Sequence, residues 1–357
     1  MISVIIPVFN RDKLLAATLQ SVREQSLQDW ECIIVDDGST DNSLALIRSF
    51  CEQDRRFKLL QREREPKGAP TCRNIGWQNA KNDYIVFLDS DDLLAPWALE
   101  ERFIFFEENK TCDYILSPAM EFSKTNNKHF KYRSNIRCRE PLMEFLSFQS
   151  VWQTSCPTWK KSALETINGW DEEAMSWQDG ELHIRALIKN ITFKWSTEIP
   201  DIFLRIDRDM HKITHERNYK KITNNVIIFK KILLKLDKEN QKIFYKHIEI
   251  WFYRLVENAN KIESKKLHEL SKQLSNDAHW KTKKIRYYNN IYQATKNIPG
   301  LRKLIYLIRE IGLFFPHRKN LFIKYQVPKT ILNKLKLNLQ GSSLERELAC
   351  LKNQKNT

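Results

Sequence analysis

The sequence Phe87-Leu88-Asp89-Ser90-Asp91-Asp92 places three carboxylates directly after an apolar run that begins at Tyr84. A short apolar run bounded by polar residues is typical of a buried strand. Carboxylates at i and i+2 in the following loop can converge on one hard cation, which takes oxygen ligands and keeps substrate phosphates in its shell. An Asp-rich turn that caps the helix after Pro96 explains the same residues, so this stretch alone leaves both interpretations open.

Outward from this stretch, strands and helices alternate through the first 110 residues. Apolar patterns predict strands at Ile2–Val8, Glu31–Asp36, Phe57–Gln61 and Tyr84–Leu88, and helices at Asp12–Gln25, Asn42–Cys51, Pro70–Ala80 and Pro96–Glu108. This alternation predicts an α/β fold with a mostly parallel sheet and helices on both faces, in which ligands bind beyond the carboxyl ends of the strands. Residues 112–210 are less regular, with short strands near 114–118 and 193–195 and helices near 141–148 and 178–189.

Three more motifs are expected at the same sheet edge. Asp36-Asp37-Gly38-Ser39 follows the second strand, where a capped turn explains the glycine and serine but not two adjacent acids. Pro7-Val8-Phe9-Asn10 ends the first strand and offers an aromatic face and an amide suited to a nucleobase. Gly68–Asn74 opens a helix and puts Arg73 near its N-terminus, which is a favourable place for a diphosphate.

These four motifs, in this order and spacing, resemble the family 2 glycosyltransferases of the GT-A fold over about residues 1–210. The resemblance implies a GT-A catalytic domain at residues 1–212. Its residues 1–110 would form the nucleotide-sugar-binding half and residues 111–212 the acceptor-binding half. From about residue 213 to 357 the pattern becomes purely helical, and we expect an α-helical, basic C-terminal region there.

The resemblance also implies roles for single residues. Those expected to bind the nucleotide-sugar donor, with a preference for uridine, are Pro7, Phe9, Asn10, Asp37, Arg73, Asp89 and Ser90. Those expected to hold Mn²⁺ or Mg²⁺ are Asp91, Asp89 and His211.

The family's catalytic base lies in an E-D-x-E-like motif, which reads here Gln178-Asp179-Gly180-Glu181. The resemblance makes Asp179 the base, whereas a helix N-cap is the structural alternative. Gln178 departs from the usual acid. The expected activity is an inverting, metal-dependent hexosyl transfer from a nucleotide-sugar to a saccharide or lipid-linked saccharide, in bacterial cell-surface glycan biosynthesis.

The net charge of +15 is unevenly distributed. Residues 1–200 carry 25 Lys and Arg against 30 Asp and Glu, whereas residues 201–357 carry 34 against 14. A segment with this excess of Lys and Arg favours binding to an anionic surface, although solvated Lys-rich helices would have the same excess of positive charge. The segment Pro299–Pro316 has the pattern of an interfacial membrane helix and equally of a helix docked on the catalytic domain. A nucleic-acid- or membrane-binding protein with a silent GT-A domain is the competing function, but no nucleic-acid-binding signature is present, so nucleic acid is not expected as a partner.

The remaining features bear on location. Seven scattered cysteines without a C-x-x-C motif favour a reducing compartment, and no apolar run reaches the 18 residues that span a bilayer. We therefore predict a cytoplasmic protein. The basic residues of the C-terminal region further suggest peripheral association with the cytoplasmic face of the inner membrane. Sequence reasoning assigns no oligomeric state. It also leaves open whether Trp152, Trp159, Trp170 and Trp177 stack on sugars or pack in the core.

Overall fold

The computed structural model describes residues 1–123, 131–146, 149–206 and 327–348, with single positions between 224 and 241. The chain forms two compact units. The first comprises Met1–Pro141, Ser150–His211 and Lys324–Thr357, and the second Leu142–Gln149 and Lys212–Ile323. Within the second unit, the buried residues Ile228, Ile232 and Leu236 recur at helical spacing. Both sheets and the candidate site described below belong to the first unit.

A seven-stranded sheet in the order β10-β6-β9-β4-β1-β2-β3 forms the centre of the first unit. The strands β1 (Ile2–Val8), β2 (Trp30–Asp36), β3 (Phe57–Gln61) and β4 (Tyr84–Phe87) are parallel. β9 (Pro157–Lys160) runs antiparallel between β4 and β6 (Tyr114–Leu116), and β10 (Phe193–Trp195) pairs with β6 in parallel. β1 and β2 are buried along their whole length, because their neighbours and the covering helices exclude water from both faces.

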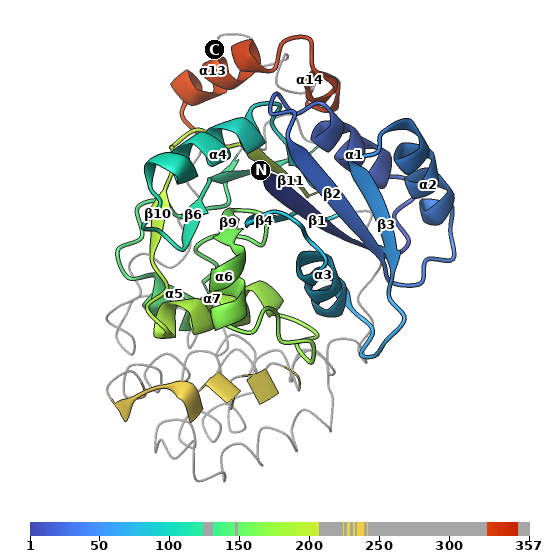
Figure 1. Cartoon of the computed structure of the whole chain (residues 1–357). Coiled ribbons are helices and arrows are strands. Elements are labelled where there is room, and N and C mark those ends of the chain that lie inside the picture. The colour runs from blue at the N-terminus through green and yellow to red at the C-terminus, as the bar shows by residue number, and fades with distance from the viewer. Residues whose placement is uncertain are drawn as a thin grey trace, which may run out of the picture. The chain divides into compact units, whose positions relative to one another are not determined.

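The helices follow from the strand order. α1 (Leu15–Arg23) and α2 (Ser43–Gln53) connect strands in one direction across the sheet, and α3 (Ala69–Gln78) connects β3 back to β4 in the other. Because such crossovers are right-handed, α3 is expected on the opposite face from α1 and α2, and Figure 1 shows this arrangement. The other helices of the first unit are α4 (Ala98–Glu108), α6 (Lys161–Thr166) and α7 (Gln178–Ile188). All of α5 (Pro141–Leu146) except Pro141 belongs to the second unit.

A second sheet has the order β5-β11-β7-β8, from β5 (Leu93–Leu94), β11 (Ile202–Arg205), β7 (Ala119–Phe122) and β8 (Lys131–Tyr132). Arg102 of α4 donates to both carboxylate oxygens of Asp201 at 2.7 and 2.8 Å, just before β11. Both side chains are almost fully buried. Removing one partner of such a pair would leave an uncompensated buried charge, so the pair fixes α4 to the start of β11.

The core of residues 111–212 is aromatic. Trp152 and Trp159 are fully buried, and the ring of Tyr114 stacks on Trp159 at a centroid distance of 4.3 Å. His183 of α7 lies against both tryptophans, and burial lowers its pKa to about 3. Of the two interpretations of the tryptophan cluster, core packing therefore holds for Trp152 and Trp159.

The predicted α/β class with a mostly parallel sheet is confirmed, and the predicted division at residue 212 stays a prediction. Within the C-terminal part, α13 (Lys329–Asn338) and α14 (Ser343–Glu347) lie in the same unit as the N-terminal strands, and α14 contacts α1 (Figure 1). The hydroxyl of Ser343 donates to Glu24 Oε2 at 2.6 Å. None of the described helices has the length and apolar character needed to cross a bilayer.

α3 approaches β1 very closely. A Cβ atom added at Gly76 would lie 2.2 Å from Cγ2 of Ile5, which is fully buried in β1. We therefore expect Gly76→Ala to lower the free energy of unfolding by about 1–3 kcal/mol, the usual cost of overpacking a core. Equilibrium denaturation in urea measures this change.

The matched background is Ile5→Ala, which removes the clashing methyl group. In that background Gly76→Ala should cost less, because the added methyl group fills part of the vacated space. An equal cost in both backgrounds would show that the helix–strand contact does not require the glycine.

Candidate active site

The loops after β1 and β2 are joined at the carboxyl edge of the sheet. Val8 pairs with Asp36, and the N–H of Asp37 donates to the oxygen of Val8 at 2.8 Å. Oδ2 of the buried Asp36 accepts hydrogen bonds from the N–H groups of Gly38 and Ser39 at 2.9 and 3.0 Å. Asp36 therefore organises the turn, which gives the first of the two adjacent acids a structural role that the turn interpretation had left unexplained.

Pro7 and Asn10 shape the end of β1. The backbone oxygen of Ile5 accepts a hydrogen bond from the N–H of Leu88, so the backbone of Ile5 faces β4. Pro7, two residues later in β1, faces the same way but lies beyond the end of β4. The missing N–H of proline therefore costs no ladder bond there. Asn10 has a φ of 51°, and its side-chain oxygen accepts from the N–H of Thr40 at 2.8 Å. The nucleotide-binding roles of Pro7 and Asn10 stay predictions.

Asp37 pairs with an arginine from the loop between β3 and α3 (residues 62–68). Arg62 Nε donates to Asp37 Oδ1, and the N–H of Gly68 approaches the same oxygen at 3.4 Å. The ion pair is nearly buried, with 11% of the Arg62 side chain and 8% of the Asp37 side chain exposed. Cys72 lies beside it, and burial, together with the charge of Asp37, raises the pKa of the Cys72 thiol to about 12.

Phe9 is an exposed aromatic residue at this edge. It follows Val8 as Asp37 follows Asp36, so the two lie at neighbouring positions of adjacent strands. Phe9 is 42% exposed, and Nζ of Lys67 lies 3.7 Å from the centroid of its ring. The ring and the ion pair thus follow the ends of adjacent strands, and their role in binding a nucleobase stays a prediction.

Arg73 connects the two halves of the site. Its Nη2 donates to Asp89 Oδ1 at 2.7 Å, and its Nη1 donates to Gln178 Oε1 at 3.0 Å. Its guanidinium lies 4.4 Å from the ring of Trp170, and its side chain is only 6% exposed. The start of α7, where the motif of the predicted base lies, is therefore fixed beside the acidic loop by the nearly buried guanidinium of Arg73.

The acidic loop after β4 contains two carboxyl groups with raised pKa values, Asp91 and Asp92. Burial and the charge of Asp89 raise the pKa of Asp91, and Arg11 Nε is 3.9 Å from Asp91 Oδ2. Burial and the charges of Asp89 and Asp91 raise the pKa of Asp92 well above its usual range. Asp92 Oδ1 accepts from the N–H of Arg205 at 3.3 Å. Nearby cations therefore compensate this cluster only in part.

These residues fit a divalent cation that also binds substrate. Among the described residues, no three His, Cys, Asp or Glu side chains are placed to enclose a metal ion. Mg²⁺ and Mn²⁺ sites of nucleotide enzymes commonly use one or two carboxylates plus phosphate oxygens, which is what Asp89 and Asp91 can supply. Ser90 is buried, and its backbone oxygen accepts from the hydroxyl of Thr18 at 3.1 Å. The predicted ligand His211 lies outside the described residues.

Asp179 lies in the first turn of α7 and is half-buried. Burial raises its pKa, as does the charge of Asp89, while the N–H of Gly180, Arg73 and Arg133 act in the opposite direction. Trp177 precedes the helix with a φ of 56°, and a Cβ atom added at Gly180 would lie 2.1 Å from its indole ring. The glycine is therefore required for the ring to lie across the start of the helix.

The second acid of the motif, Glu181, forms a buried ion pair with Arg185. Glu181 and Arg185 form a two-contact ion pair at 2.6 and 2.7 Å, and both are almost fully buried. Arg185 also donates to the backbone oxygens of Ile167 and Gly169. These contacts fix the orientation of α7 and hence the position of Asp179.

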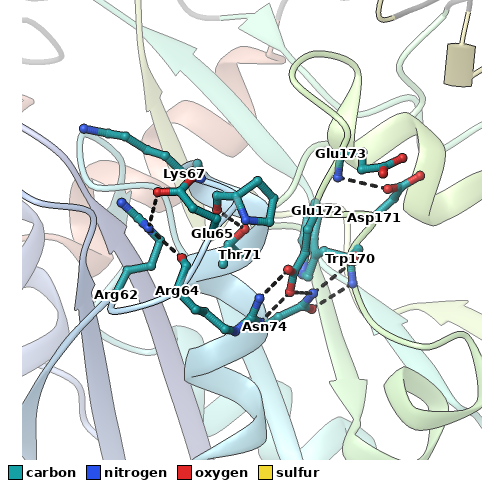
Figure 2. Close-up of polar contacts among 12 residues, drawn as sticks. Arg62, Arg64, Glu65, Lys67, Thr71, Asn74, Trp170, Asp171, Glu172 and Glu173 are labelled. Atoms are coloured by element: carbon teal, nitrogen blue, oxygen red, sulfur yellow. Dashed lines mark hydrogen bonds and ion pairs between the residues drawn. The ribbon is translucent and has the colours of Figure 1, made fainter.

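Figure 2 shows a second link between the two halves of the first unit. Arg64 donates to both oxygens of Glu172, with Nη2 at 2.6 Å from Oε1, and Asn74 Nδ2 donates to the same Oε1 at 2.8 Å. Asn74 also bonds the backbone of Trp170 in both directions, at 2.9 and 3.0 Å. The loop that leads to Asp179 is thus attached to α3 and to the β3–α3 loop.

Sequence reasoning expected Asp37, Arg73, Asp89 and Asp91 at one sheet edge, and the structure places Asp37 after β2 and Arg73 on Asp89 there, with Gln178 of the base motif on the same arginine. It missed Arg62, Arg11 and the Arg64–Glu172 pair. The signal for Arg62 was its position directly after β3, next to a strand, β2, that ends in Asp36 and is followed by Asp37. Parallel strands in register end side by side, so the residues that follow them are neighbours.

Comparisons with known proteins bear on the family and the fold. The sequence profile described as glycosyl transferase family 2 matches residues 3–163. Glycosyltransferase GlyG of Streptococcus pneumoniae is 30% identical over 160 residues, which cover 45% of this chain and 52% of that protein. The chain spans about half the length, or less, of the curated relatives it matches first.

Solved structures show the same fold. S. aureus TarS residues 1–349, in complex with UDP, superposes with a TM-score of 0.57 at 17% identity and covers 87% of this chain and 91% of that one. A mannosyltransferase from Pyrobaculum calidifontis in complex with GDP-Man and Mn²⁺ gives 0.53 at 16% identity, with 95% and 87% covered. Residues 3–163 therefore form a glycosyl transferase family 2 domain, built on the GT-A fold.

Proposed function

We propose that this protein is an inverting, divalent-cation-dependent glycosyltransferase. It transfers a hexose-type sugar from a nucleoside diphosphate donor, most favourably a uridine one, to a saccharide or lipid-linked saccharide in bacterial cell-surface glycan biosynthesis. The observation that carries the proposal is the pair of hydrogen bonds by which Arg73 joins Asp89 to Gln178. They hold Asp179, the proposed proton acceptor, close to the loop that is proposed to bind the cation.

The donor would bind across the ends of β1, β2 and β4. Phe9 offers a ring face, and Asp37 offers a carboxylate, at neighbouring strand positions. Arg73 lies in the first half of α3, near the N-terminal end that favours an anion. Support for a nucleotide donor comes from related folds that were solved with UDP and with GDP-Man.

The cation would be Mn²⁺ or Mg²⁺, held by Asp91 and Asp89, with His211 as a further proposed ligand. When bound, it would neutralise charge on the diphosphate leaving group. The partly uncompensated charge of Asp89, Asp91 and Asp92 supports this assignment, since such a cluster gains from a nearby cation.

Asp179 would act as the general base. Its carboxylate would accept the proton of the acceptor hydroxyl while that oxygen bonds to the anomeric carbon from the side opposite the diphosphate. The bond between the anomeric carbon and the diphosphate oxygen breaks in the same displacement, which inverts the configuration. Only one protein base is needed for this chemistry.

The location proposed for the protein is cytoplasmic, at the inner face of the membrane. The excess of Lys and Arg in residues 201–357 supports attraction to anionic lipid headgroups. The segment Pro299–Pro316, which carries the amphipathic part of this argument, lies outside the described residues.

Asp179→Asn should lower kcat by about 10²–10⁴-fold, because general base catalysis is worth about that much. Binding of UDP should be unchanged, since the carboxylate contacts the acceptor and not the nucleotide. Release of UDP or GDP from a panel of nucleotide-sugars, with isothermal titration of UDP, measures both quantities. Asp29→Asn, at an exposed loop position, is the matched control and should have no effect.

Asp91→Asn should remove the stimulation of turnover by added Mn²⁺, because one carboxylate ligand is lost. The same panel, run with Mn²⁺ and after chelation, measures this. Full activity in both Asp91→Asn and Asp179→Asn would rule out the proposed function.

Gln178→Glu should move the acidic limb of the kcat/KM profile to higher pH. The new carboxylate would add a negative charge next to Asp179 and raise its pKa further, and the base works only when it is deprotonated. Activity would then be lost at a higher pH as the solution is acidified.

Asn190→Asp introduces the same charge just beyond the far end of α7 and should leave the limb in place. If the acidic limb of the kcat/KM profile of Gln178→Glu does not move, or moves to lower pH, the role of Asp179 as the titrating base is contradicted.

A further inference from the structure

A stripe of polar side chains is buried along α1 and the residues that follow it. Thr18, Ser21 and Gln25 recur at helical spacing, and at most 3% of each residue is exposed. The buried face of a helix in an α/β fold is usually apolar, as Leu19 and Val22 are here. Because a buried polar group costs free energy unless it is hydrogen-bonded, three such groups on one face need partners.

Two members of the stripe bind the backbone between the acidic loop and α4. The hydroxyl of Ser21 accepts from the N–H of Leu94 at 3.2 Å. Gln25 uses both ends of its amide: Nε2 donates to the oxygen of Ala95 at 2.7 Å, and Oε1 accepts from the N–H of Leu99 at 2.9 Å. These side chains therefore fix the segment that leaves the acidic loop to α1.

The third member, Thr18, binds the acidic loop itself. The N–H of Asp92 donates to the oxygen of Asp89 at 3.0 Å, which closes a β-turn with Ser90 and Asp91 at its centre. The oxygen of Ser90, on the central peptide of this turn, accepts from the Thr18 hydroxyl at 3.1 Å. Rotation of the central peptide is what distinguishes the two common types of turn. The Thr18 hydroxyl therefore favours one orientation of this peptide, and with it one direction for the carboxylates on either side.

We propose that Thr18 is a positioning residue for the cation site. Its hydroxyl holds the central peptide of the turn so that Asp89 and Asp91 can share one divalent cation. The inference rests on the proposed function, which supplies the cation and its two carboxylate ligands. Thr18 is fully buried and acts through the backbone of Ser90. Without the hydroxyl, the turn would also populate orientations that bind a cation less tightly, and the apparent affinity would fall with the population of the competent one.

The test measures how much Mn²⁺ tightens the binding of UDP to the full chain. Isothermal titration with UDP is run in Mn²⁺ and in EDTA, and the ratio of the two dissociation constants reports on the cation site. Thr18→Val replaces the hydroxyl by a methyl group of similar size. It should reduce this ratio about 3- to 10-fold, the effect of one hydrogen bond, and leave the affinity for UDP in EDTA unchanged.

A series of variants separates the hydroxyl from packing. Thr18→Ser keeps the donor and should retain the wild-type ratio. Thr18→Cys has a weaker donor, so its ratio should lie between those of the wild type and Thr18→Val, and it assigns the effect if Thr18→Val does not fold. Thr158→Val makes the same change in β9, where the buried hydroxyl has no hydrogen-bond partner among the described residues, and should have no effect.

The outcomes distinguish this inference from the proposed function. A wild-type ratio in Thr18→Val, or in Thr18→Cys where only that variant folds, overturns the inference and leaves the proposed function standing. An equal loss in Thr18→Ser or in Thr158→Val also overturns it, because packing and not the hydroxyl would then hold the turn. If the wild type binds UDP equally in Mn²⁺ and in EDTA, the cation dependence in the proposed function fails as well.

Discussion

The site depends on a concentration of carboxylates at one edge of a parallel sheet. Because parallel strands end together, β2 and β4 deliver Asp36, Asp37 and Asp89 to the same place, and the loop after β4 adds two more acids. Like charges this close would destabilise the fold unless cations met them. Arginines from separate loops and helices do so: Arg11 precedes α1, Arg62 follows β3 and Arg73 lies in α3. The compensation is partial at Asp91 and Asp92, and that is where a divalent cation and a diphosphate are proposed to act.

Arg73 and Asn74 also explain how two halves of different character work as one site. Arg73 joins the acidic loop to the first residue of α7, and Asn74 holds the loop before it through the backbone of Trp170. With Gln178 in place of an acid, the ion pair that Arg73 forms in the described part of the chain is with Asp89, and its charge also acts on the carboxyl group of Asp179. The substitution is thus compatible with an arginine that must also attract donor phosphates.

Much of the first half could be predicted from sequence, because β1 to β4 and their helices have clear apolar periodicity and end in turn residues. β9 was not predicted: its four residues are buried between two antiparallel neighbours and show no alternation. The second sheet was missed because β5 and β8 contain two residues each. Arg62 lies in a highly charged loop that reads as solvated, and only the register of β2 with β3 places it on Asp37. The packing of α14 on α1, through Ser343 and Glu24, connects residues 319 positions apart and leaves no local signal.

Anomalous diffraction from crystals of the full chain grown with UDP and Mn²⁺ tests the central claim most directly. One manganese peak is expected within coordination distance of a carboxylate oxygen of Asp91, with the remaining ligands including diphosphate oxygens. UDP bound at this edge without such a peak, its diphosphate held by Arg11 or Arg73 alone, would contradict it.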